Sequence, residues 1–538
     1  MEQLDPVRGA APRITASATS ATATAAARRS AAGTTTGRGA GPGAGRRWAA
    51  LAVLMFPVLL VAVDNTVLSF AVPAVSAALE PSAQQLLWII DIYPLVLAGL
   101  LVPMGSLSDR LGRRRMLLIG GAGFAVVSAA AAFAPHAEAL IASRALLGFF
   151  GAMLMPATLS LIRNIFEDPS ERRTAIAVWA AGFSGGAALG PILGGWLLEH
   201  FWWGSVFLLA VPVLVPLLVL GPFLLPESRD PSPGPVDPVS ILLATMTLLP
   251  LVYGIKAATT AESPLVPVLA AGLGLACGAV FVRRQLARRS PMLDVRLFRN
   301  PVFSGALSVN LLSVFAFVGF IYFLAQHLQL IAGLTPMRAG MMMLPGLGLT
   351  VLFGFLAVPL ARRLPVSRLV VAGLGLNAVA YGIVLAWGHT GSVVALMAAF
   401  SVLGAGVGLA ETLSNDMALS AVPASKAGAA SAISETAYEV GSVLGTAVLG
   451  SILNAAYSRN LVVPSIVEAG DADRATQTLG GAHQVAGELA AQESAAAARL
   501  LESAAHAFDS GVTITAGIAI VVTLVAAVVV SRALRGKA

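Results

Sequence analysis

Long apolar runs separated by short polar segments dominate this chain. A helix needs about 20 apolar residues to cross a bilayer, and we count fourteen runs of suitable length. They cover residues 48–72, 85–107, 116–135, 138–162, 174–198, 204–225, 239–256, 264–282, 301–328, 339–360, 367–388, 392–418, 427–455 and 511–531. This pattern predicts an all-α polytopic membrane protein with fourteen transmembrane helices.

Three segments lie outside these runs. Residues 1–47 are rich in Ala, Thr, Ser, Gly and Arg and predict a disordered cytoplasmic tail, with a transit peptide as the alternative. Residues 456–510 are rich in Ala, Glu and Gln and predict a helical hairpin on the extracellular face, with a disordered loop as the alternative. Residues 532–538 form a short cytoplasmic tail.

Positive charges alternate with the runs. If the N-terminus is cytoplasmic, 28 of the 34 Lys and Arg residues fall in cytoplasmic segments, whereas Lys256 falls in an exterior loop. This asymmetry follows the positive-inside rule, so we expect a plasma-membrane protein, bacterial in origin, with both termini in the cytoplasm.

Composition excludes several classes of protein. Hydrophobic residues make up 57% and charged residues 11%, far from the roughly 25% charged residues of soluble domains. The net charge of +7 is spread over short loops, which argues against a nucleic-acid partner. The single Cys277 excludes a disulfide framework and a thiolate metal cluster. With no nucleotide loop or catalytic triad evident, we expect no enzyme activity, no cofactor and no metal.

A weak internal repeat predicts two halves. VPMGSLSDRLGRRRMLLIGG at 102–121 resembles VPLARRLPVSRLVVAGL at 358–374. We therefore expect a six-helix half at 48–225 and a second at 301–531, with two inserted helices in a linker at 226–300. Parallel six-helix halves are the architecture of secondary transporters with a central site.

The segment GSLSDRLGRRR concentrates charge between the second and third runs. Such a cluster cannot rest in hydrocarbon and predicts a short cytoplasmic loop, in which glycine permits a sharp turn and the acid can lock onto a neighbouring helix end. The alternative is a stop-transfer charge cluster. The predicted gating loop comprises Gly105, Asp109, Arg110, Gly112 and Arg113.

Glycines recur every four residues in the fifth run, GFSGGAALGPILGGWL, and line one stripe of a helix. Such stripes let another helix approach closely, and Gly190–Pro191 invites a kink. Helix packing alone is the alternative to a moving hinge. The predicted hinge comprises Gly186, Gly190, Pro191, Gly194 and Gly195.

Carboxylates inside the runs are the main candidates for chemistry, because ionisable groups are costly in a bilayer. Asp64 and Asp91 lie in the first and second runs, and Glu435 and Glu439 lie one helical turn apart in the thirteenth. Two neighbouring carboxylates in a low dielectric repel, so at least one carries a proton much of the time. Such a group can exchange a proton for an organic cation.

Four further residues are secondary candidates. Arg144 is a cation that favours proton release from a nearby carboxylate, with snorkelling to the surface as the alternative. Trp88 shares a helix face with Asp91. The alternative for Asp91 is a position at the membrane–water interface without a role in transport. Tyr438 adds cation–π attraction beside the glutamates. Asp416 is alternatively a helix-end charge.

Several motifs together resemble a transporter family. VDNTVLSFAVP, SDRLGRRR, GPILGG and SETAYEVGSVLGTAVLGSI resemble segments of the major facilitator superfamily, and within it the fourteen-span drug:proton antiporter type 2 family with its quaternary-ammonium efflux pumps of the QacA type. The resemblance implies that Asp64, Asp91, Glu435 and Glu439 serve proton coupling and cation recognition. No acidic residue stands in the tenth run, where some of these pumps carry one that helps with divalent cations.

We therefore expect a monomeric, proton-coupled antiporter that exports lipophilic cationic compounds: quaternary ammonium compounds, dyes and fluoroquinolones. Its partners are these small molecules, protons and the lipid bilayer. A dedicated exporter of an endogenous antibiotic or metabolite is the alternative, and a membrane sensor without transport is a more distant one.

Overall fold

The computed structural model describes residues 44–229, 237–258, 263–288, 291–387, 391–422, 427–491 and 493–534. Within these ranges the regular elements are helices, and the predicted set of fourteen helices long and apolar enough to cross a membrane is confirmed. The first seven spans are formed by α2 (Ala44–Leu79), α3 (Ala83–Leu111), α4 (Arg113–Ala131), α5 (Ala137–Ile165), α6 (Pro169–His200), α7 with α8 (Ser205–Leu208 and Ala210–Leu224) and α9 (Pro238–Ala257).

The other seven spans include two π-helical segments, η2 and η5. They are formed by α10 (Leu265–Ala287), α11 with η2 (Pro301–Gln326 and His327–Ile331), α12 (Pro336–Ala361), α13 (Val366–Trp387), α14 (Val393–Ser420), α15 with η5 and α16 (Ala427–Leu444, Gly445–Gly450 and Ser451–Asn460) and α19 (Ser494–Leu534). A short 3₁₀ helix, η1 (Val295–Arg299), precedes α11.

The chain divides into two units, Met1–Trp48 and Ala49–Ala538. Of the first unit only 44–48 is described, and it is helical. Most of the predicted N-terminal tail (1–43) and the end of the predicted C-terminal tail (535–538) lie outside the described residues. The arrangement below concerns the second unit.

The glycine stripe of α6 has a counterpart in the second half. A Cβ on Gly186 would lie 2.8 Å from the Cβ of Ala62, so α6 packs closely on α2. A Cβ on Gly445 would lie 2.5 Å from the carbonyl oxygen of Phe315, so the start of η5 packs closely on α11. Both halves thus use glycine for a close approach between helices.

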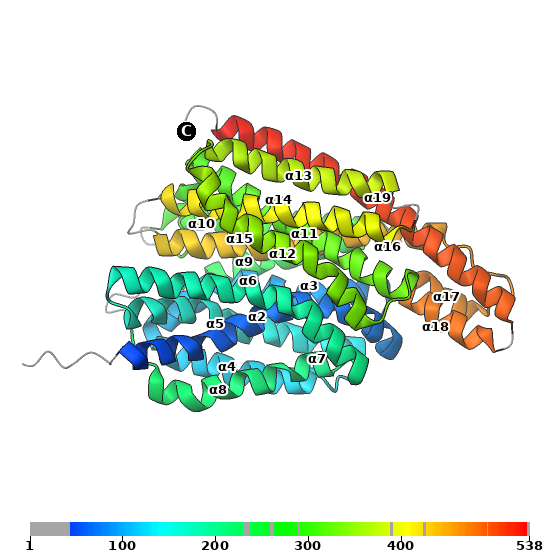
Figure 1. Ribbon diagram of the computed structural model, residues 1–538, viewed down its shortest axis with the longest axis horizontal. Helices are drawn as coiled ribbons and strands as arrows, with labels where there is room; N and C mark the ends of the chain where they lie inside the picture. Colours follow the sequence, from blue (N-terminus) through cyan, green and yellow to red (C-terminus); the bar gives the residue numbers. More distant parts are fainter. Residues whose placement is uncertain are drawn as a thin grey trace, which may run out of the picture. The chain divides into compact units, whose positions relative to one another are not determined.

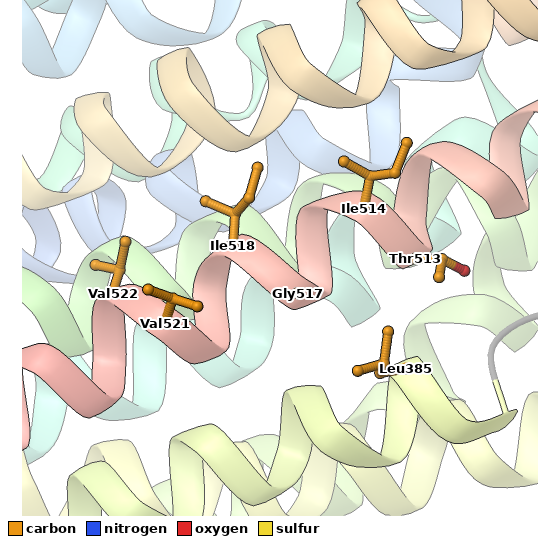
Figure 2. A pocket seen from close by; sticks show the side chains of 7 residues that line it. All are labelled: Leu385, Thr513, Ile514, Gly517, Ile518, Val521 and Val522. Carbon is orange, nitrogen blue, oxygen red and sulfur yellow. The ribbon is translucent and has the colours of Figure 1, made fainter.

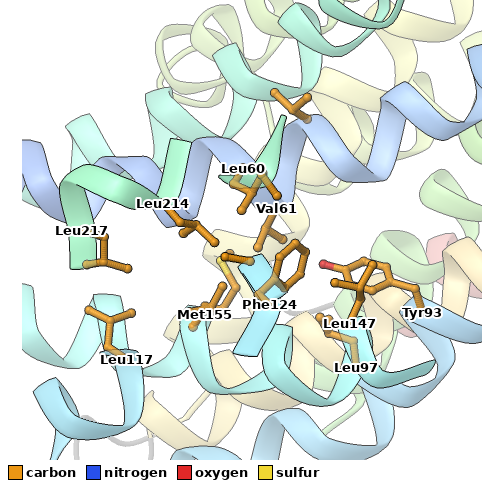
Figure 3. Packing of buried hydrophobic residues seen from close by; sticks show 14 of the residues in the cluster. Leu60, Val61, Tyr93, Leu97, Leu117, Phe124, Leu147, Met155, Leu214 and Leu217 are labelled. Carbon is orange, nitrogen blue, oxygen red and sulfur yellow. The ribbon is translucent and has the colours of Figure 1, made fainter. Parts of the chain in front are cut away.

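Large apolar side chains fill the core of the first half. Tyr93 of α3 meets Phe124 of α4 edge-on, with ring centroids 6.3 Å apart. Leu117, Leu214 and neighbouring residues continue this cluster towards α8 (Figure 3). This packing fixes α3 and α5, the helices that carry two of the predicted site residues.

The inserted helices α9 and α10 pack on each other, and α9 also packs on α3. Most of α10 is exposed to the surroundings of the bundle, with Val268 and Leu275 both 65% exposed. At one end Asp237 accepts two hydrogen bonds of 3.0 Å from the Arg284 guanidinium, which joins the start of α9 to α10.

Residues 456–510 are largely helical. The end of α16, α17 (Ala469–Gln477), α18 (Leu479–Ala490) and the start of α19 lie at one end of the bundle (Figure 1). Arg474 pairs with Asp471 and Glu488 at 2.7 Å each, and with Glu80 in the turn between α2 and α3 at 3.3 Å. The segment is thus tied to the first half of the chain.

A shallow apolar groove lies between α13 and α19 (Figure 2). It is lined by residues such as Leu385, Ile514 and Val521, which are 43–61% exposed. The groove faces outward from the bundle and contains none of the predicted site residues, so we assign it no functional role.

The two halves meet at the end of the bundle that carries the α2–α3 turn. Gln329 of η2 donates to the Phe70 carbonyl at 3.2 Å. A Cβ on Gly195 of α6 would lie 2.7 Å from the Cα of Met337 in α12. A Cβ on Gly450 would lie 2.8 Å from Leu87. These contacts bring the halves close together at this end.

Candidate functional site

Asp64 and Arg144 form a buried ion pair inside the first half. The Asp64 Oδ2 lies 2.8 Å from an Arg144 guanidinium nitrogen, and their side chains are 9% and 2% exposed. Arg144 also donates to the Ile89 carbonyl at 3.2 Å and lies 4.5 Å from the centroid of the Tyr93 ring. The predicted cation and carboxylate are therefore in direct contact, and the snorkelling alternative for Arg144 is wrong.

Asp91 has a cation of its own, which sequence reasoning misplaced. The Lys256 Nζ lies 2.8 Å from the Asp91 Oδ2, with both side chains at most 1% exposed. The prediction that Lys256 lies in an exterior loop is wrong, because the side chain turns inward from the last turn of α9. Its ammonium also lies 4.1 Å from the centroid of the Trp88 ring. Asp91 is thus buried in the bundle beside an ammonium group.

The glutamates of α15 lack such cations. Glu439 is 1% exposed, and its Oε2 has no hydrogen-bond partner among the described residues. Glu435, one turn earlier, is half-buried, and so is Glu411 of α14. The electrostatic neighbours of this set include no cation in the described part of the chain; Glu411 and Glu439 each interact with Glu435. The result is a cluster of three carboxyl groups.

The acidic groups of the two halves meet around this cluster. Asp64 of α2 lies within electrostatic range of Glu439, and the buried Tyr93 lies within range of both. The Tyr93 hydroxyl has no hydrogen-bond partner among the described residues. Sequence reasoning did not single out Tyr93 and did not include Glu411 among the site residues. Glu411 stands inside the apolar run 392–418, and an acid in such a run was a usable signal.

An aromatic row runs from α6 of the first half to Tyr438, the residue before Glu439. The Phe183 ring of α6 meets the Tyr438 ring of α15 at 6.3 Å, nearly perpendicular. Trp179, one turn earlier on α6, stacks on Phe183 at 6.4 Å. Aromatic faces beside carboxylates attract organic cations, so this row is suited to flat cationic ligands.

A small polar network positions the start of α15. Asn310 of α11 donates to the Ser434 carbonyl and hydroxyl at 3.2 Å each. The Ser434 hydroxyl donates to the Asn415 side chain at 2.6 Å. The network holds α11, α14 and α15 together directly beside Glu435. Asp416, by contrast, is exposed near the end of α14, as its helix-end alternative requires.

The predicted gating loop is mostly helix. α3 runs through Leu111, so Gly105 is helical and packs against Pro156 rather than forming a turn, and that part of the prediction is wrong. Gly112 alone makes the break, with φ of 115°, a conformation that favours glycine. Asp109, near the end of α3, pairs with Arg113, the first residue of α4, at 2.7 Å.

Arg114 makes the contact between this turn and the end of α8. The Arg114 guanidinium donates to the carbonyls of Pro222 and Leu225 at 3.1 and 3.2 Å and lies 3.7 Å from Glu227. Arg110 lies on the exposed side of the same turn. The Asp109 carboxylate contacts Arg113 at the start of the neighbouring helix α4, and Arg114 adds the contacts to the end of α8.

The predicted hinge residues divide between two neighbours. Gly190 and Gly194 face Thr66 and Val67 of α2, whereas Pro191 and Gly195 face α12 of the other half. Pro191 makes close contact with Gly340, where a Cβ would collide with the Pro191 carbonyl. This stretch of α6 therefore packs closely against both α2 and α12.

Comparisons with known proteins agree with this arrangement. The model of the Major Facilitator Superfamily matches residues 54–446. The multidrug efflux pump LfrA of Mycolicibacterium smegmatis is 55% identical over 91% of this chain and 97% of its own. The methyl viologen resistance protein SmvA of Salmonella typhimurium is 38% identical over 86% and 93%.

Solved structures share the fold. A bacterial homolog of the human lysosomal transporter Spinster, in an inward-facing and unoccupied conformation, matches with a TM-score of 0.61 and 17% identity over 92% of this chain and 100% of that chain. This likeness shows that the chain shares the fold of that structure.

Proposed function

Because this chain belongs to the Major Facilitator Superfamily, a superfamily of membrane transporters, we propose that it is a proton-coupled antiporter that exports lipophilic cationic drugs. The observation that carries the proposal is that Asp64, paired with Arg144, lies within electrostatic range of Glu439, whose electrostatic neighbours among the described residues include no cation. The efflux and resistance names of its relatives support the same class of substrate.

The arrangement supports exchange of a cation for protons. A buried carboxylate without a counter-ion is costly, so Glu435 and Glu439 favour either a proton or an organic cation. A cation that enters along the row from Trp179 to Tyr438 displaces the proton, and the next proton expels the cation. Arg144 pairs with Asp64 and orients it beside the cluster.

Alternating access needs one end of the bundle closed at a time. We place the Gly112 turn in the cytoplasm by the positive-inside rule, so the end where the halves meet faces outward and substrate enters from the cytoplasm. The seam of α6 against α2 and α12 then moves as the halves rock. We propose that the pump acts as a monomer in the plasma membrane.

The test is ethidium efflux from cells that express this chain, with and without a protonophore, beside Asp64→Asn and Glu435→Gln. Efflux that stops with protonophore and falls in both variants supports the proposal. Asp416→Asn is the matched control, since Asp416 is exposed on the adjacent helix. Well-expressed protein without ethidium efflux overturns the proposal in favour of a dedicated metabolite exporter.

A further inference from the structure

A lysine occupies a place in this protein that has the chemistry of an organic-cation site. The Lys256 ammonium touches a carboxylate oxygen of Asp91 at 2.8 Å, lies 4.1 Å from the Trp88 centroid and donates to the Leu87 carbonyl at 2.9 Å. An anion, an aromatic face and a carbonyl are the groups that recognise a quaternary or aromatic cation.

This place is separate from the glutamate cluster. The charges that act on Glu439 are those of Glu435 and Asp64, whereas the charge that acts on Asp91 is that of Lys256. Among the described residues these are two separate acidic sites, the carboxyl groups around Glu439 and the carboxylate of Asp91, and the Lys256 ammonium occupies the second.

We propose that Asp91 and Trp88 form a second cation subsite, for the second positive charge of an organic dication, and that Lys256 is a tethered occupant that must be displaced. Lys256 thereby sets a preference for monocations over dications. The inference rests on the function proposed above and specifies its substrate class.

The subsite lies where the halves meet. Asp91 and Trp88 belong to α3 of the first half, and the buried Thr446 beside Asp91 belongs to η5 of the second. π-helical turns inside α-helices are frequent at functional sites. Any motion that separates α3 from η5 uncovers Asp91.

Lys256 stays with α3 during such a motion. Its helix, α9, packs on α3, and its ammonium donates to a carbonyl of α3. The uncovered subsite is therefore already neutralised. A monocation bound at the glutamates is indifferent to it, whereas the second charge of a dication has to compete with the ammonium.

The experiment compares two probes in everted membrane vesicles: ethidium, a monocation, and methyl viologen, a dication. Lys256→Met should raise the ratio of methyl viologen transport to ethidium transport by about tenfold, the size of a desolvated cation–π contact. Lys256→Arg, which keeps the charge, should retain the unmodified ratio. Asp91→Asn combined with Lys256→Met should lose the gain.

Each other outcome overturns the inference. An unchanged ratio in Lys256→Met at normal membrane abundance makes Lys256 a purely structural partner, and a gain that persists without Asp91 assigns the effect elsewhere. If Lys256→Met does not accumulate, Lys256→Gln carries the same test, because its amide can still donate to Leu87. Absence of ethidium transport in the unmodified protein overturns the proposed function instead.

Discussion

The acidic residues of the two halves differ in their counter-ions. Asp64 and Asp91, on α2 and α3, each lie 2.8 Å from a buried cation. Glu435 and Glu439, on α15, have acidic neighbours, and within the described residues no cation acts on either. All four lie inside membrane-spanning helices, and they differ in the partners of their carboxyl groups.

This difference separates two roles. A carboxylate with a guanidinium or ammonium beside it is neutralised by the protein's own side chain. A carboxyl group without such a partner must be neutralised by a proton or a substrate cation. We therefore assign proton exchange to α15 and its neighbour Glu411, and acids with side-chain counter-ions to α2 and α3.

Glu439→Gln is expected to have the largest effect. One pH unit supplies about 1.4 kcal/mol per proton and sustains about a tenfold cation gradient. Without the buried Glu439 carboxyl, uphill export should disappear and leave only downhill exchange. Proteoliposomes with an imposed pH gradient and entrapped ethidium measure this directly. Asp416→Asn should keep the gradient, and uphill transport by Glu439→Gln would refute the division of roles.

Arg144→Met tests the paired side of the comparison. Removing one partner of a buried ion pair typically costs about 3–5 kcal/mol, because the other charge stays buried. The variant should unfold at a markedly lower temperature in detergent. Asp64→Asn combined with Arg144→Met should recover most of that stability while transport stays lost. A double variant as unstable as Arg144→Met alone would show that Arg144 acts through its packing on Tyr93.

The sequence predicted the unpaired side of the site better than the paired side. Helical spacing alone places Glu435 and Glu439 on one face, because residues four apart share a face in any helix. The Asp91–Lys256 pair joins residues far apart in sequence, and only helix packing brings them together. Sorting charges by their distance from a span end put Lys256 outside the membrane, since that rule does not see a partner across the bundle.

Local chemistry explains the remaining differences. The fourteen spans follow from hydrophobic length, and Gly112 was recognisable as a turn residue. Gly105 was not distinguishable from it by residue type, and the structure uses its small size for packing against Pro156. A glycine in the sequence thus indicates either a close approach between helices or a turn, and the three-dimensional structure is needed to tell the two apart.

Gly186→Ala should have an intermediate effect, because Gly186 lies where α6 packs against α2. Its Cβ would lie 2.8 Å from Ala62, so α6 and α2 must separate slightly. Gly185, the preceding residue, has open space, and Gly185→Ala is the matched control. Overpacking typically costs about 1–3 kcal/mol, and we expect slower transport with unchanged proton dependence. Equal behaviour of the two alanine variants in an efflux time course would contradict a close seam.

The smallest effect is expected at a third acid–base pair, which lies just outside the spans. The hydrogen bonds from Arg284, and those from Ser240, hold the pKa of Asp237 well below its usual range. A lowered folded-state pKa stabilises the protein above the ordinary value of about 4, and this contribution fades as the pH falls below it. Asp237→Asn should therefore lower the melting temperature slightly at pH 7, and the difference should start to shrink near pH 4 and go on shrinking as the pH falls further. A difference that does not change with pH would mean that Asp237 joins α9 to α10 through shape alone, with its charge playing no part.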